Sequence, residues 1–228
     1  MPRSVSRLVP KVPAVPGAGR RQQFSASTKR TLLDVAEGLF TEHGYAATSL
    51  DAVVAGAEVT KGALYHHFNG KAALFEAVFE RVEQDATRSI SQALKGRKDP
   101  WEKAQAGLRQ FLEVVQEPRY RRIVIQDGPA VLGYERYREQ EERSTFGTVV
   151  EIVRAVAGVG EWDLDEEMLH TFARIFFGAM SAAGASVATA AEPDVAAWRV
   201  EAAIGFIISG FQAMADAEVV PPWLAEDD

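Results

Sequence analysis

The chain has 228 residues, no cysteine, and 32 acidic against 25 basic side chains, which gives a formal net charge of −7. This length suits one sizeable domain or two small ones, and 47% hydrophobic residues is ordinary for a globular core. The absence of cysteine excludes disulfide scaffolds, thiol nucleophiles, zinc knuckles and iron–sulfur clusters. The longest apolar runs, such as residues 204–208, are far shorter than the ~20 residues that span a bilayer. We therefore expect a soluble, cytoplasmic protein with no membrane partner.

Charge is distributed unevenly along the chain. Residues 1–71 carry nine basic and five acidic side chains, a net charge of +4 that leaves −11 for residues 72–228. A basic head on an acidic body favours a head that meets a polyanion such as nucleic acid. A solvated basic tail would explain the same count, because five of the nine basic side chains lie in residues 1–24.

Residues 1–24 are predicted to form a disordered basic arm. They contain four prolines and no helical period. Arg20 and Arg21 match the dipeptide of twin-arginine export signals, but polar residues follow where an apolar stretch should be. Export is therefore not expected.

From Ser25 onward the apolar residues recur with a helical period, and no stretch alternates as a half-buried strand would. The first apolar stripe ends at Gly44, a residue suited to the position just after a helix. Residues 48–51 have the form of a capping box and open a short helix. A second short segment covers residues 60–68, and a long helix follows Asn69 and Gly70.

Further helix starts are marked in the second half of the chain. Residues 99–102 combine a capping aspartate, a proline and a glutamate, residues 163–166 resemble another capping box, and Pro193 opens the last helix. The sequence thus predicts an all-α fold. We expect a three-helix domain over residues 25–71 and a larger helical domain over residues 72–228.

The two short helices outline a helix-turn-helix, with helices at residues 49–56 and 60–67 and a turn at residues 57–59. The second helix of this motif lies in a groove of DNA, so its outward residues should be small or able to donate hydrogen bonds. Gly62 would weaken an ordinary helix by about 1 kcal/mol relative to alanine, and close approach of the backbone to DNA explains its presence. A surface helical turn in a bundle would give a similar pattern.

Residues 59–71 closely resemble the recognition-helix signature of TetR-family transcriptional regulators, and the resemblance extends over roughly residues 25–80. Outside the signature it is carried by Ala36, Leu39, Phe40, Gly44, Tyr45, Thr48, Ser49, Ala73, Leu74 and Phe75. One residue departs from the pattern, because Glu58 stands where the family usually has a turn glycine. The resemblance implies a homodimeric DNA-binding protein, usually a repressor, that a small-molecule ligand releases from a palindromic operator.

The resemblance also implies individual contacts with double-stranded DNA. Thr48 and Ser49 would lie where the first motif helix meets a phosphate, and Lys71 would reach a phosphate from the start of the long helix. The residues expected to face base edges in the major groove are Thr60, Lys61, Gly62 and Ala63. Those expected to contact the DNA backbone or neighbouring bases are Tyr65, His66 and His67.

The larger helical domain should hold the ligand between its helices, the usual kind of site in a bundle. The candidate pocket residues are Trp101, Phe111, Gln126, Tyr134, Tyr137, Phe146 and Phe176. For dimerisation, small residues between Phe176 and Gly184 would permit close helix approach. A 4-3-4-3 series would add a coiled-coil-like seam, formed by Val200, Ile204, Ile207, Phe211 and Met214. These two segments predict a four-helix bundle between two subunits.

Other functions have less support in the sequence. The spacing of Glu167 and His170 is that of di-iron bundle proteins, but such a site needs a second copy, so no metal is expected. The sequence has no phosphate loop, nucleophile elbow or carboxylate–histidine cluster, so neither an enzyme nor a cofactor is expected. The alternative is a constitutive DNA-binding module of the same fold that has no physiological inducer.

Overall fold

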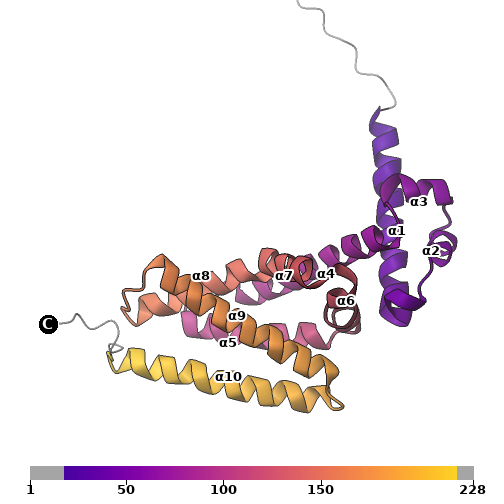
Figure 1. Cartoon of the computed structure of the whole chain (residues 1–228). Coiled ribbons are helices and arrows are strands. Elements are labelled where there is room, and N and C mark those ends of the chain that lie inside the picture. The colour runs from indigo at the N-terminus through magenta and orange to yellow at the C-terminus, as the bar shows by residue number, and fades with distance from the viewer. Residues whose placement is uncertain (1–17, 220–228) are drawn as a thin grey trace, which may run out of the picture.

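The computed structural model describes residues 18–219, and in that range it contains helices and no strands, so the all-α prediction is confirmed (Figure 1). Two of the segments, η1 and η2, are π-helical. The elements in chain order are α1 (Ala18–Ala47), α2 (Leu50–Gly56), α3 (Lys61–His67), α4 (Lys71–Leu94), α5 (Pro100–Gln116), η1 (Tyr120–Asp127), α6 (Gly128–Leu132), α7 (Tyr134–Glu141), η2 (Glu142–Phe146), α8 (Gly147–Val159), α9 (Glu166–Thr189) and α10 (Pro193–Asp216).

Helix α1 begins at Ala18, seven residues earlier than expected. Residues 18–24 are therefore helical, which corrects the prediction that they belong to a disordered arm, and the rest of that arm lies outside the described residues. The regular part of the helix ends at Gly44, where φ is 78°. A side chain at this φ would be strained, and an added Cβ would also meet the guanidinium of Arg122.

The first three helices share one core with the start of α4. Its fully buried members include Leu32, Phe40, Val53, Leu64 and Phe75. Helix α2 is capped by Ser49, whose Oγ accepts a hydrogen bond from the backbone N–H of Ala52, so the cap lies one residue later than the predicted box. The core fixes how α3 is presented, because Leu64 points inward.

Helix α4 leaves this N-terminal unit and enters the helical bundle formed by the later helices (Figure 1). Most of the predicted helix starts in the bundle are confirmed. Asp99 caps α5 and Pro193 opens α10, whereas α9 is capped by Asp165 and not by Asp163 as the predicted box implied. The single helix α4 therefore packs both in the N-terminal unit and in the bundle, within one continuous hydrophobic cluster.

Ion pairs also join the N-terminal unit to the bundle. Arg81 of α4 pairs with Asp34 at 2.6 Å and with Glu37 at 2.5 Å, both on α1. Arg119, just before η1, reaches Asp85 of α4 at 3.1 Å and the same Glu37 at 3.6 Å. These partly buried pairs lie at the place where α1, α4 and η1 meet.

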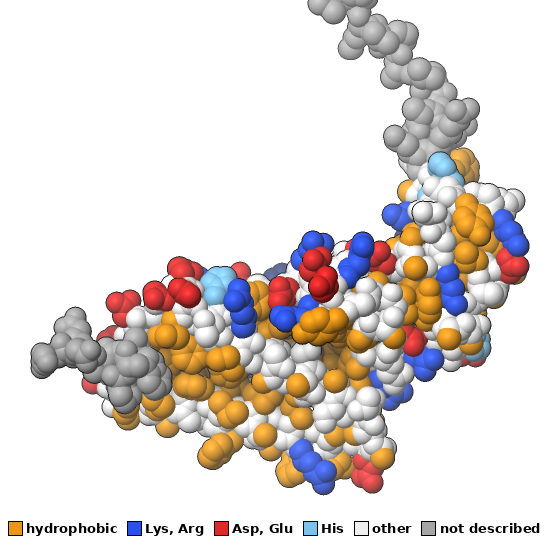
Figure 2. Space-filling model, in the orientation of Figure 1, with side chains coloured by type: hydrophobic (Ala, Val, Ile, Leu, Met, Phe, Trp, Pro, Cys, Tyr) orange, Lys and Arg blue, Asp and Glu red, His pale blue; other side chains and the backbone are white. Residues whose placement is uncertain are grey.

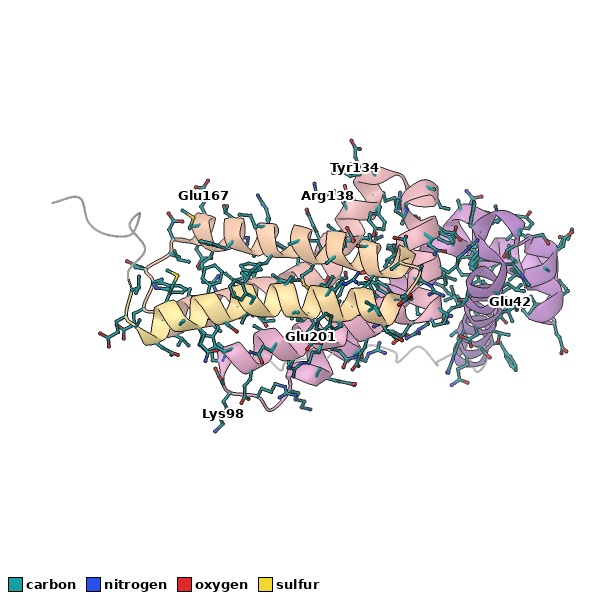
Figure 3. All side chains as sticks on the ribbon, turned by 90° about the horizontal axis from the view of Figure 1, so that it is seen from below. Glu42, Lys98, Tyr134, Arg138, Glu167 and Glu201 are labelled. Atoms are coloured by element: carbon teal, nitrogen blue, oxygen red, sulfur yellow. The ribbon has the colours of Figure 1, made fainter. Side chains whose placement is uncertain are left out.

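Helices α9 and α10 lie side by side along one face of the bundle, as the view from below shows (Figure 3). Among the described helices, α9 alone is long and apolar enough to cross a membrane by length and composition, although polar residues interrupt its apolar runs. Yet only 22% of its most apolar window is buried, although it packs against α5, α8 and α10. Its outer face is therefore apolar and uncovered in one chain.

The turn between α2 and α3 places Glu58 at φ 53°, the conformation that usually selects glycine. We expect Glu58→Gly to raise the free energy of unfolding by about 0.5–1 kcal/mol, because relief of about 1–2 kcal/mol of strain exceeds the added chain entropy. Glu161→Gly, at φ 51°, should have a similar effect, and Glu151→Gly inside α8 should destabilise the protein. Urea unfolding measures all three, and destabilisation by Glu58→Gly would contradict the strain argument.

Candidate functional site

Helix α3 presents its predicted recognition face to solvent. Two apolar residues, Leu64 and Phe68, are buried and hold the helix on the core. The exposed residues of the face are Thr60, Lys61, Gly62, Tyr65 and His66, with Ala63 and His67 half-buried beside them. The Thr60 hydroxyl also caps the helix by accepting a hydrogen bond from the Ala63 N–H. The structure thus gathers these seven residues on one surface.

Two residues of this face have informative surroundings. The Lys61 ammonium lies 2.7 Å from a carboxylate oxygen of Asp51 on α2, and this contact raises the pKa of Lys61. A base contact by Lys61 would therefore require the pair to separate. A Cβ added at Gly62 would meet only the Thr60 hydroxyl, at 3.8 Å. Packing inside the chain therefore does not require glycine at this position.

The aromatic residues of α3 form the next part of the surface. Tyr65 is 59% exposed, and the rings of His66 and His67 are 5.1 Å apart in an edge-on arrangement. Burial lowers the pKa of His67, and the nearby charges of His66 and Lys29 lower it further. A neutral imidazole can both donate and accept a hydrogen bond.

Thr48 is placed differently from the prediction. Its side chain is buried, and its hydroxyl donates to the carbonyl of Gly44 at 2.8 Å. The hydroxyl therefore fastens the end of α1, and its predicted contact with a phosphate is corrected. Ser49 is exposed at the start of α2, next to the helix N–H groups.

Lys71 lies at the start of α4. Its ammonium is 4.3 Å from the centre of the Tyr45 ring and donates to the carbonyl of Ala46. Gly70 precedes it as the N-cap with φ 101° and supplies no side-chain cap. The first N–H groups of α4 are therefore open to an anion, beside a positive charge.

A cavity of about 800 Å³ lies within the bundle, lined mainly by apolar side chains of α4, α5, α7, α8, α9 and α10. The structure brings six of the seven predicted pocket residues to its wall: Trp101, Phe111, Tyr134, Tyr137, Phe146 and Phe176. Gln126 is not among them. It is exposed on η1 and accepts a hydrogen bond from Arg122, so its predicted place in the pocket is wrong.

Glu167 and His170 do not form a metal site with other residues. Glu167 points outward near the start of α9 (Figure 3), and the ring of His170 lies 6.1 Å from that of Phe146. Within residues 18–219 no group of three potential ligands stands close enough to hold a metal ion.

An acidic cluster in the cavity wall was not predicted from the sequence. Glu83 of α4 is only 4% exposed, and its Oε2 accepts a hydrogen bond from the hydroxyl of Ser144 at 2.5 Å. Its other oxygen, Oε1, is buried and has no hydrogen-bond partner in the described residues. An acid next to Phe79 and Val82 on the apolar stripe of α4 was the signal in the sequence.

Glu141 of α7 is the second acid of this cluster. Its Oε1 accepts hydrogen bonds from the hydroxyls of Tyr137 and Ser181, each at 3.0 Å. Burial raises the pKa of Glu141 and that of Tyr137. The cavity is thus mostly apolar, with its polar groups concentrated in one acidic region.

Burial raises the pKa of Glu83 to about 7; the hydrogen bond from Ser144 and the nearby hydroxyl of Tyr120 oppose the rise, and the charge of Glu141 adds to it. The native state therefore keeps a proton up to about pH 7 that the unfolded chain loses near pH 4.5. The native state binds more protons between these values, so this group lowers the free energy of unfolding as pH rises from about 4.5 to about 7.

Glu83→Gln should remove this dependence. Through this group the parent protein should lose about 2–3 kcal/mol of unfolding free energy between pH 5 and pH 8, the amount that such a pKa difference implies. The variant should not show this loss. Urea unfolding at both pH values measures it, and Glu151→Gln on the exposed face of α8 controls for the removal of one charge. An equal pH dependence of parent and Glu83→Gln would contradict the assignment.

Two family models match the chain, one for each part of the structure. The model described as "Bacterial regulatory proteins, tetR family" matches residues 32–78, and "Tetracyclin repressor-like, C-terminal domain" matches residues 101–211. Among curated relatives, the HTH-type transcriptional regulator AcrR of Shigella flexneri is 38% identical over 68 residues, which are 30% of this chain and 32% of that protein. The Transposon Tn10 TetC protein of Escherichia coli is 30% identical over 116 residues, which are 50% and 57% of the two chains. The chain thus spans about a third to somewhat over half of these two relatives.

Solved structures match over a larger share of the chain. A TetR-family transcriptional regulator from Pectobacterium atrosepticum has a TM-score of 0.72 and 28% identity, covering 83% of this chain and 96% of that one. RolR in complex with resorcinol shares the fold, with a TM-score of 0.62 and 21% identity over 88% of this chain and 98% of that one. The two family models match the α2–α3 motif and the bundle separately, and each of these solved structures aligns with most of the chain. The chain therefore belongs to the TetR family of DNA-binding transcriptional regulators.

Proposed function

We propose that this regulator is a cytoplasmic repressor that binds a palindromic DNA operator as a homodimer and is released by a small molecule held in the bundle cavity. The observation that carries the proposal is the course of α4. This helix begins at Lys71 beside the DNA-binding surface, and its middle forms part of the cavity wall at Glu83. One rigid element thus connects the two sites.

The DNA-binding half of the proposal rests on α3 and the helix starts around it. Lys61 supplies a donor to a base edge, and the open backbone at Gly62 allows close approach to the groove floor. Ser49 and Lys71 lie at helix N-termini, where a phosphate is favoured. The remaining DNA contacts follow from the exposed face of α3, formed by Thr60, Ala63, Tyr65, His66 and His67.

Release by a ligand follows from the geometry of α4. Twelve residues separate Lys71 from Glu83, which is about 18 Å along a helix. A ligand that shifts α4 at the cavity also shifts its first turn, and the ion pairs of Arg81 make α1 follow. RolR, which shares the fold, was solved with resorcinol, a small aromatic molecule. Likeness to that complex supports a binding role for the cavity, and we propose no catalysis.

The dimer is proposed to form through the outer faces of α9 and α10, where Figure 2 shows hydrophobic side chains gathered. The most exposed apolar residues there are Ile175 at 63%, Trp198 at 67% and Phe206 at 82%. Exposed apolar surface of this kind marks an interaction site. A two-fold pairing of these faces would place two α3 helices in one assembly and so requires a palindromic operator.

This surface differs from the predicted seam. Val200, Ile204 and Phe211 pack on the core of their own chain, so that part of the 4-3-4-3 series faces inward. Gly184 is likewise an internal contact, since an added Cβ would come within 2.8 Å of the Phe111 ring. The most exposed residues of α10, Trp198 and Phe206, lie on the other side of the helix, and of the predicted series Ile207 is 48% exposed. The location of the predicted seam is therefore corrected, while the dimer stays a proposal.

Lys61→Ala and Lys71→Ala should separate base recognition from phosphate contact. Lys61→Ala should relax the preference at one symmetric pair of positions, with a loss of roughly 1–3 kcal/mol per half-site. Lys71→Ala should weaken binding to all DNA sequences alike and flatten the slope of log K against log salt by about 1.8 per dimer. Binding-site selection at two salt concentrations measures both.

Lys98→Ala is the matched control for these variants, because this lysine lies in the α4–α5 connection, away from α3 (Figure 3). It should change neither the selected sequence nor the salt slope. If the parent protein selected no palindrome, the repressor proposal would fail. If it selected one that Lys61→Ala left unchanged, only the role given to Lys61 would be wrong.

Phe206→Glu tests the dimer. A charge at this 82% exposed position cannot be buried in an apolar interface without a large cost, so the variant should sediment as a monomer at micromolar concentration. Phe24→Glu places the same charge at a 71% exposed phenylalanine of α1 and should leave the dimer intact. A parent protein that sediments as a monomer would refute the proposed assembly.

A further inference from the structure

The polar groups of the cavity are arranged asymmetrically. In its wall, the buried Glu83 from α4 and the half-buried Glu141 from α7 face the hydroxyls of Tyr120, Tyr137 and Ser181. All of these side chains are acidic or neutral. The cavity therefore offers hydrogen-bond acceptors in an otherwise apolar space.

The cationic groups of the wall lie elsewhere. Arg138 of α7 is exposed, pairs with Glu142 at 2.8 Å, and stands with Tyr134 at the outer edge of the molecule (Figure 3). Arg174 of α9 is exposed as well. Within residues 18–219, neither Glu83 nor Glu141 makes an ion pair. The charge of Arg138 acts on Glu141, whereas none of the groups that shift the pKa of Glu83 is a cation, so a positive charge beside Glu83 would have to come from a bound molecule.

The unsatisfied oxygen of Glu83 points to the same conclusion independently. Its Oε1 is buried in the cavity wall with no donor, whereas its Oε2 is held by Ser144. Buried acceptors without a donor are rare in proteins and costly, so such an atom is a candidate contact for a ligand. The required partner is a hydrogen-bond donor at the end of an apolar body.

We propose that the cavity takes a protonated amine carried on a largely apolar body, with the ammonium donating to Glu83 Oε1 and compensated by Glu141. The inference rests on the proposed function, since it names the ligand class of the same cavity. The aromatic walls formed by Trp101, Phe111 and Phe176 receive the body of the ligand. An anionic ligand would meet the buried Glu83 and the half-buried Glu141 and is disfavoured.

The test uses three probes with one body: 4-(1-naphthyl)butylamine, the matching alcohol and the matching carboxylate. Calorimetry of the full chain at pH 8 should give affinity for the amine about tenfold or more above that for the alcohol, as a charge-assisted hydrogen bond implies. The carboxylate should bind most weakly. Equal affinity for amine and alcohol, or no detectable binding of the amine, would overturn the inference.

Variants of α4 identify the group responsible. Glu83→Gln should lower affinity for the amine about tenfold and leave affinity for the alcohol nearly unchanged, since glutamine keeps the shape and removes the charge. Glu80→Gln changes an acid one turn earlier that accepts a hydrogen bond from Gln140 outside the cavity wall, and it should alter neither. An unchanged amine affinity in Glu83→Gln would also contradict the proposal.

Proton release gives a readout that a merely structural role would not produce. The groups facing Glu83 are Tyr120 of η1, Ser144 of η2, and Tyr137 and Glu141 of α7, and none supplies a positive charge. An ammonium placed against Glu83 favours its ionised form, so at pH 6 binding of the amine should release a proton. Calorimetry in two buffers of different ionisation enthalpy detects it, and the alcohol should release none.

The same preparation is tested for DNA binding, which separates this inference from the proposed function. If it selects a palindrome and the alcohol or the carboxylate releases it better than the amine, the inference fails and the repressor proposal stands. If it selects no palindrome but binds the amine through Glu83, the repressor proposal fails and the ligand class stands.

Discussion

The continuity of α4 is the constraint on which the rest of the structure depends. Its first turns bury Leu74 and Phe75 in the core beneath the recognition helix, and its later turns bury Ile90 in the bundle. An α-helix resists bending because each turn is held by its own backbone hydrogen bonds. The two cores therefore cannot reorient independently, and the pairs that Arg81 forms with Asp34 and Glu37 extend this restriction to α1.

The cavity imposes a cost on the same helix. A leucine in place of Glu83 would suit the apolar stripe of α4, yet the chain buries an acid there with one oxygen unsatisfied. Such an arrangement lowers stability in the empty protein and is relieved when a donor enters. The binding energy of the proposed ligand would thus act directly on the helix that carries the DNA-binding unit.

The sequence predicts local features well and tertiary ones poorly. The Asp99 cap was predicted because its side chain bonds to its own helix start, the Ser49 cap lies one residue from the predicted position, and the α2–α3 motif is equally local. The orientation of α10 about its own axis is not a local feature. Both of its sides are apolar, so periodicity alone does not tell which side faces the core. Gln126 was likewise predicted to line the cavity from its neighbours in sequence, but its side chain is exposed. Glu83 and Glu141 come together only because α4 and α7 pack against the same cavity, which the sequence alone does not indicate.

The ion pair between Lys61 and Asp51 has a consequence for the search along the genome. A lysine that neutralises a phosphate releases cations condensed on the DNA, and this release drives non-specific association. Lys61 instead already holds a carboxylate of its own chain at 2.7 Å, and Asp51 repels any phosphate that approaches. At DNA of random sequence, separating the pair adds little binding free energy, whereas a correctly placed guanine offers two acceptors to Lys61 in exchange. In the proposed complex with DNA, the pair would therefore shorten the time spent on wrong sites and widen the gap in residence time between the operator and other DNA.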